Sequence, residues 1–208
     1  MVGRIRANAE SFGRRLAPEG TCDPNLIVAI VPSAQAFVDS MRSNNSWLLA
    51  ELDKDERELL MGAHGPAKAL LRVRPRTRDG LPIARRENLT DLPQADMWMA
   101  HSLIYTATRN DIVSALVLFD RDAVRDLTIE QLADYATFRA FTGALPQTAV
   151  ARSASIYSLF DGAAAKPAGL TPFDIAYLGE LYDGQANIPG STREVALEKA
   201  TGTDIFEQ

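Results

Sequence analysis

The sequence predicts an α+β fold: a mixed sheet of about four strands that includes a β-hairpin, covered by helices and followed by a mainly helical C-terminal third. Three observations lead to this prediction. The apolar run LIVAIV at 26–31 lacks alternation, which is typical of a strand covered on both faces and therefore central in its sheet. Residues 67–74 alternate as a strand does, and the second half of the chain carries repeated helix-start signals.

Helices are expected between the first two strands. Ser33 is placed to cap a helix that ends at residues 43–45. Asp53 and Glu56 form a capping box that opens a further short helix. In the first helix the apolar positions recur at helical spacing: Ala34, Phe37, Val38 and Met41.

The strand at 67–74 and the segments after it complete the expected sheet. Pro75 cannot donate a ladder hydrogen bond, so it favours a sheet edge or a strand end. Residues 98–106 alternate and residues 112–119 are apolar, and a polar segment lies between them. We expect these two strands to form the β-hairpin, with a tight turn at Arg109, Asn110 and Asp111.

The remaining chain is expected to be mainly helical. Thr128 with Gln131 is a capping box for a helix that ends near Gly143, and its apolar stripe consists of Ile129, Leu132, Ala133, Ala136 and Ala140. A short helix is expected around 156–159. Thr171 followed by Pro172 and Asp174 opens a helix whose core contacts are Phe173, Ala176, Tyr177 and Leu181, and Ser191 with Glu194 opens a last one.

Length and composition predict one domain over residues 1–208, with residues 1–20 as a loosely attached N-terminal segment. The longest apolar runs are too short to span a bilayer, so no transmembrane segment is expected. The first residues lack the apolar core of a signal peptide. We therefore expect a cytoplasmic protein, or a periplasmic or secreted one if an export signal has been removed.

Common catalytic chemistries lack their usual residues in this chain. Cys22 is the only cysteine, the chain has two histidines, and neither HExxH nor the common nucleophile and phosphate motifs occur. We therefore predict no metal, no cofactor and no assigned catalytic residue. Two weak candidates are His101, as a base, and Asp120, at a predicted strand end; the alternatives are a hydrogen-bonded structural histidine and a turn or helix-cap carboxylate.

Positive charge is concentrated in one part of an acidic chain. The net charge is −5, but residues 66–86 carry +6, which leaves −11 elsewhere. Within this region four alternating arginines share one face of an extended chain: Arg72, Arg74, Arg76 and Arg78. They indicate either a solvated edge that discourages strand pairing or a site for an acidic protein, lipid headgroups or a glycan phosphate. Nucleic acid is disfavoured, because no aromatic residue lies between the arginines.

Three segments carry a family resemblance: CDPNLIVAIV, residues 111–141, and LTPFDIAYLGELYDG at 170–184. They resemble uncharacterised, often exported proteins of alphaproteobacteria, which implies a periplasmic or secreted location. Related families resemble zincin-type metalloproteases, whose helix carries HExxH. The corresponding helix here, EQLADYATFRAFTGA at 130–144, has no histidine, so the resemblance implies a degenerate scaffold without metal ligands.

Two functional hypotheses follow. The first is a non-enzymatic envelope or secreted protein that binds an anionic or protein partner through the basic region. The alternative is a hydrolase-like enzyme, on a degenerate zincin scaffold or with a dispersed serine, histidine and acid site. The alternative requires a cleft in which His101 or Asp120 meets a second polar group at hydrogen-bond distance.

Overall fold

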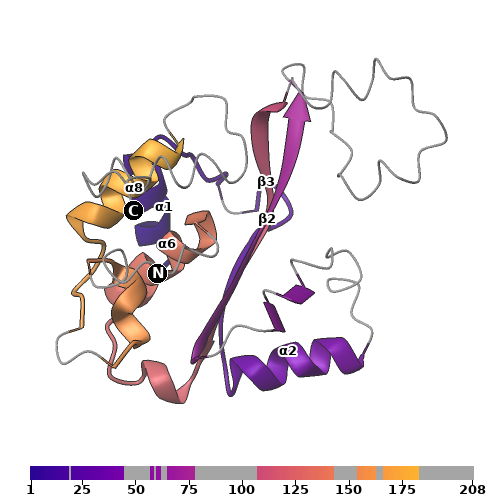
Figure 1. Cartoon of the computed structure of the whole chain (residues 1–208), viewed down its shortest axis with the longest axis vertical. Coiled ribbons are helices and arrows are strands. Elements are labelled where there is room, and N and C mark those ends of the chain that lie inside the picture. Colours follow the sequence, from indigo (N-terminus) through magenta and orange to yellow (C-terminus); the bar gives the residue numbers. More distant parts are fainter. Residues whose placement is uncertain are drawn as a thin grey trace, which may run out of the picture.

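A computed structural model shows the fold of the chain, and it describes the following residues: 1–18, 20–44, 57–58, 60–61, 65–77, 107–142, 154–162 and 166–182. The side chains of 73–77 and 107–111 are not described. Within these limits the predicted α+β class is confirmed, because a mixed sheet packs between helices on its two faces (Figure 1).

The sheet contains three described strands in the order β1-β3-β2. They are β1 (Leu26–Val31), β2 (Ala67–Thr77) and β3 (Ala107–Asp120); β1 is parallel to β3, and β2 is antiparallel to it. The central strand is therefore β3, and the prediction that LIVAIV is central is wrong for the described sheet. The apolar run of β1, at 26–31, and that of β3, at 112–119, both lack alternation, so the local pattern does not separate an edge strand from a central one.

The expected turn at Arg109, Asn110 and Asp111 is also wrong, because all three residues lie within β3. They pair with β2 in the order Arg76, Pro75 and Arg74. Polar residues can continue a strand, because the ladder is formed by backbone groups that every residue other than proline supplies in full. The other half of the predicted hairpin, at 98–106, lies outside the described residues, as do the helices predicted from Asp53 and Ser191.

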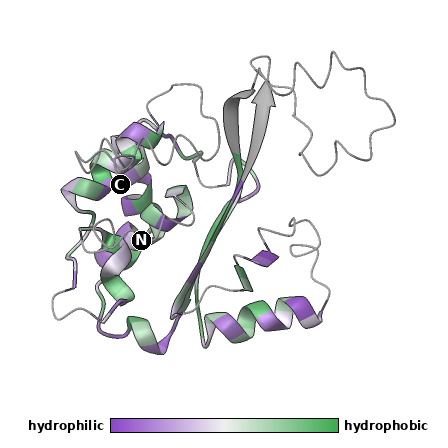
Figure 2. Ribbon diagram, viewed as in Figure 1, coloured by the Kyte–Doolittle hydropathy of each residue, from purple (hydrophilic) through white to green (hydrophobic). Residues whose placement is uncertain are grey.

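Helices cover the sheet unequally (Figure 1). On one face α6 (Ile129–Thr142) packs against β2 and β3, and around it lie α1 (Val2–Ser11), α8 (Pro172–Tyr182) and the 3-10 helix η3 (Ile156–Phe160). On the other face lies α2 (Ala34–Ser43). A short 3-10 turn, η2 (Asp122–Val124), follows β3. Figure 2 shows that the strands are mainly hydrophobic where they pass between these layers.

Three helix starts that the sequence predicts are confirmed. In each, the hydroxyl of the capping residue accepts the backbone N–H three residues further along, at Ser33 (3.2 Å), Thr128 (3.1 Å) and Thr171 (3.2 Å). At the last two, the side chains of Gln131 and Asp174 accept the backbone N–H of the capping residue at 3.0 and 2.8 Å. The bonds involve neighbours in sequence, which explains why the sequence predicts them.

The burial of α6 exceeds the predicted stripe. Every residue from Leu132 to Thr142 is buried, whereas Ile129 in the first turn, expected in the stripe, is 51% exposed. The helix lies between the sheet and the other helices, so no side of its middle section faces solvent. On α8, Tyr177 and Leu181 are buried as predicted, but Ala176 is exposed.

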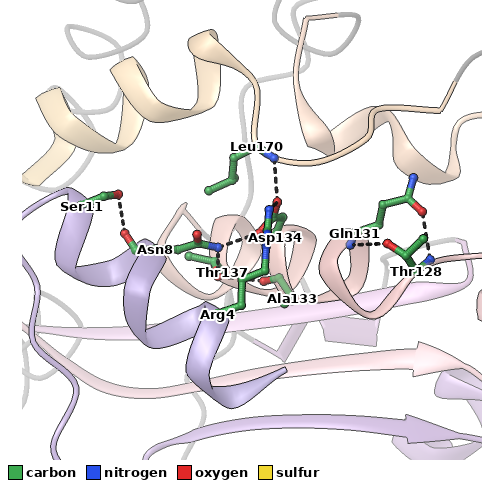
Figure 3. Close-up of polar contacts among 9 residues, drawn as sticks. All are labelled: Arg4, Asn8, Ser11, Thr128, Gln131, Ala133, Asp134, Thr137 and Leu170. Atoms are coloured by element: carbon green, nitrogen blue, oxygen red, sulfur yellow. Dashed lines mark hydrogen bonds and ion pairs between the residues drawn. The ribbon is translucent and has the colours of Figure 1, made fainter.

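A buried carboxylate joins the N-terminal helix to α6 (Figure 3). Asp134 accepts hydrogen bonds from Arg4 at 2.6 and 2.7 Å, from Asn8 at 2.8 Å and from the backbone N–H of Leu170 at 3.0 Å. Burial raises the pKa of Asp134, but these donors outweigh burial and leave the pKa below its ordinary value. Ile5 of the same N-terminal helix is buried in the core, so residues 1–11 pack against α6.

Replacement of Gly169 tests this network. A Cβ at this position would lie 2.5 Å from Asp134 Oδ2, so Gly169→Ala must displace the carboxylate from its donors. We expect the free energy of unfolding, measured by urea denaturation, to fall by about 1–3 kcal/mol. Gly179→Ala is the matched control: nothing lies within 4 Å of its Cβ, and in α8 it should leave stability unchanged or raise it. Equal stability of the two variants would contradict a stabilising role for the hydrogen bonds of Asp134.

Candidate functional site

The predicted basic residues lie on a strand pair that outgrows the rest of the sheet. β1 pairs with β3 only from Ala115 onward, whereas β2 continues to pair with β3 as far as Ala107. Residues 73–77 and 107–112 therefore form a two-stranded extension, which we call the distal ribbon; Figure 1 shows it projecting beyond the helical layers.

The proximal half of the basic face is buried. Lys68 is 1% exposed and Arg72 is 2% exposed, and Leu70 between them joins a hydrophobic cluster with Val38 of α2. The interpretation of the four arginines as a solvated edge is therefore wrong for Arg72, and Lys68 on the same face is buried too. The physical reason is α2, together with Leu60, which covers this face of the sheet.

Lys68 is held in this layer by polar contacts. Its ammonium donates a hydrogen bond to the carbonyl of Leu60 at 3.4 Å. Burial lowers the pKa of Lys68, and the negative charges of Asp39 on α2 and Asp120 at the end of β3 oppose this effect. The buried charge therefore belongs to the packing between β2 and α2, and it is not available to a partner at the surface.

The distal half of the face is defined by backbone register. Arg74 is opposite Asp111, and Arg76 is directly opposite Arg109. Opposite residues in an antiparallel ladder share a face, so these positions combine three arginines with one aspartate. Arg78 lies outside the described residues.

Arg109 is the position that the sequence reasoning missed. It was assigned to a turn because Arg109, Asn110 and Asp111 are polar. The available signal was the absence of glycine from Ala107 to Asp120, since the favoured two-residue hairpin turns usually contain one.

The two weaker candidates are placed as follows. A carboxylate oxygen of Asp120 accepts a hydrogen bond from the backbone N–H of Ala34, the first residue of α2, where Ser33 also caps the helix. This is the helix-cap role that the sequence left open for Asp120. His101 lies outside the described residues.

A second buried carboxylate joins two helix starts. Ser155 donates to Asp174 at 2.5 Å, and Asp174 also accepts backbone N–H groups of Ile156 and Thr171, both at 2.8 Å. Burial raises the pKa of Asp174, against the effect of these hydrogen bonds. Ser155 also caps the start of η3, where its hydroxyl oxygen accepts the backbone N–H of Tyr157 at 3.0 Å. The contact between Ser155 and Asp174 therefore has a structural role.

Comparisons with known proteins add no assignment: the chain matches no protein-family model, no curated protein and no solved structure. Among the described residues, no three His, Cys, Asp or Glu side chains are grouped to hold a metal ion, and Cys22 is exposed. The described helices include none long and apolar enough to cross a membrane. A functional proposal must therefore rest on the residues of the chain itself.

Replacement of Lys68 tests the buried half of the face. Because the folded pKa is lowered, the unfolded chain binds more protons between the two pKa values, so stability rises with pH as the ordinary lysine pKa is approached. We expect Lys68→Met to raise the free energy of unfolding by about 1 kcal/mol at neutral pH and to remove this rise. The measurement is denaturation at several pH values, with Lys166→Met, at an exposed lysine, as the control. A large loss of stability in Lys68→Met would show that the ammonium is a net stabilising contact.

Proposed function

We propose that this chain is a non-enzymatic envelope or secreted protein that binds an anionic partner, a lipid headgroup surface or the acidic face of a protein, through the distal ribbon. The observation that supports it most directly is the register of Arg76 opposite Arg109. The resemblance to exported proteins supports the proposed location, and the arginines of the distal ribbon support the proposed binding site.

Two arginines in direct register are unfavourable without an anion. Directly opposite residues have Cβ atoms about 4.5–5.5 Å apart, and like charges at such positions destabilise the strand pair. An anion with several oxygens can bind both guanidiniums and remove this repulsion, because the planar fork of arginine matches phosphate and carboxylate geometry. Arg74 adds a third positive charge at the adjacent position on this face, partly balanced by Asp111.

The charge distribution of the chain also favours this end. Residues 66–86 carry +6 in a chain whose net charge is −5, and five of the seven basic residues in this range follow the buried Lys68 and Arg72 in sequence. A charge separation of this kind orients an approaching anionic surface toward the basic end, while the acidic remainder repels it. The two-stranded ribbon extends away from the described helices (Figure 1).

The experiment compares two variants of equal charge. Arg74→Gln, Arg76→Gln and Arg109→Gln are combined in one variant; Arg72 stays, because it is buried. The control combines Arg42→Gln, Arg121→Gln and Arg125→Gln, three exposed arginines away from the ribbon. The probes are phosphatidylglycerol vesicles and polyglutamate, titrated at several salt concentrations.

We expect wild-type binding to at least one probe, weakened by salt. The ribbon variant should bind about 100-fold more weakly, since each arginine near an anionic surface contributes about 1 kcal/mol. The control variant should stay close to wild type. Equal losses in both variants would attribute binding to net charge alone, and no wild-type binding to either probe would contradict the proposal. The hydrolase alternative would instead be supported by turnover that His101→Ala abolishes in a folded variant.

A further inference from the structure

The two described edges of the sheet are protected very differently. β2 carries charged residues, Pro75 and two register irregularities, which are the devices that keep an edge strand from pairing with another chain. β1 carries none of them: Leu26–Val31 is wholly apolar. Among the described strands, only β3 pairs with β1, so within the described part of the chain one edge of β1 has no partner strand.

The open edge leaves apolar side chains uncovered on both faces of the sheet. Ile27 is 46% exposed and Ile30 is 44% exposed. Ala29 and Val31 pack in the cluster on the α2 side, and Val28 packs in the cluster on the α6 side. By the alternation of a strand, Ile27 belongs to the α2 side and Ile30 to the α6 side, so one further strand would cover both.

We propose that β1 pairs with β1 of a second copy of this chain, antiparallel and centred on Val28, to form a continuous six-stranded sheet. Exposed backbone N–H and C=O groups at the edge of β1 select a strand as the occupant. A second copy is the occupant that the sequence favours, because β1 can face itself without any like charges meeting although the chain as a whole carries a net charge of −5.

Backbone directions fix the centre of the pairing. The carbonyl of Asn25 accepts a hydrogen bond from the backbone N–H of Ala115 in β3 at 2.7 Å, and that of Val31 accepts one from Arg121, directly after β3, at 2.8 Å. Alternate residues of a parallel strand bond to the same neighbour, so the backbone groups of the even-numbered residues face the open edge: Leu26, Val28 and Ile30. An antiparallel pair centred on Val28 uses all of them, because Val28 faces Val28 of the second copy and Leu26 faces Ile30.

The side chains are compatible in this register. Ile30 falls opposite Leu26 of the second copy, and Ile27 falls opposite Ala29, so each exposed isoleucine gains an apolar neighbour on its own face. Residues 24–38 contain no charged residue, so no like charges meet along the strand pair. The other apolar stretch of the described sheet lies at 112–119 in β3, and from Ala115 onward it is already paired with β1 on one side and β2 on the other. β2 is an edge strand, but it carries charged residues. A single strand pair is a small interface, so the dimer should be reversible.

The first test is the mass of the protein by sedimentation equilibrium across the micromolar range. We expect a monomer–dimer equilibrium in the wild type. Ile27→Lys places a charge on the open edge and should weaken dimerisation at least about tenfold. The matched control is Ile175→Lys, at an isoleucine of α8 that is 50% exposed; it should dimerise as the wild type does. Both variants should keep the circular dichroism spectrum of the wild type.

The second test is the register. In a Cys22→Ser background, Val28→Cys should form a disulfide-linked dimer on mild oxidation, since the two Cα atoms would be about 5.5 Å apart. Ile30→Cys should not, because its neighbour is Leu26 of the second copy. Any one of four results would overturn the proposal: a wild type that is monomeric throughout, open-ended polymers, equal weakening by the two lysine variants, or crosslinking at position 30 in place of 28. None of these outcomes bears on the distal ribbon, which lies away from β1.

Discussion

The length of β3 is the constraint on which the rest of the structure depends. Its fourteen residues pair with eleven of β2 and six of β1, so the sheet is three-stranded at one end and two-stranded at the other. Where three strands meet, the central strand is buried and apolar, as in Ala115–Phe119. Where β1 has ended, one face no longer has to be buried, and the same strands carry arginine and aspartate. The distal ribbon is therefore a consequence of the mismatch in strand length, whereas the edge position of β1 follows from the strand order.

A second constraint is that buried carboxylates on the helices need hydrogen-bond donors. Asp134 and Asp174 are both buried, yet their pKa values shift in opposite directions. Asp134 faces the positive charge of Arg4, whereas Asp174 receives hydroxyl and amide donors that do not outweigh its burial. As pH falls, the contribution of Asp134 to stability is lost below its folded pKa, whereas protonation of Asp174 favours the folded state. The two effects oppose each other in acid.

The sequence predicted those features whose partners are near in the chain. The caps at Ser33, Thr128 and Thr171 bond to residues three positions away, so the local pattern was sufficient. The order of the strands, the burial of Lys68 and Arg72, and the opposition of Arg76 to Arg109 depend on segments far apart in sequence. The alternating arginines correctly indicated an extended basic strand. They did not indicate that α2 would cover the first half of this strand, because the packing of α2 on β2 depends on contacts between segments far apart in sequence.

The two proposed surfaces also constrain each other geometrically. β1 is parallel to β3, and the distal ribbon lies at the start of β3. If two copies join with their β1 strands antiparallel, the two β3 strands run in opposite directions, and the two ribbons project from opposite ends of the joined sheet. Such a dimer could bridge two anionic surfaces, but it could not place both ribbons on one flat surface to gain avidity. The affinity of the ribbon for a single surface should therefore not depend on dimerisation, because pairing at β1 leaves the register of Arg76 and Arg109 unchanged.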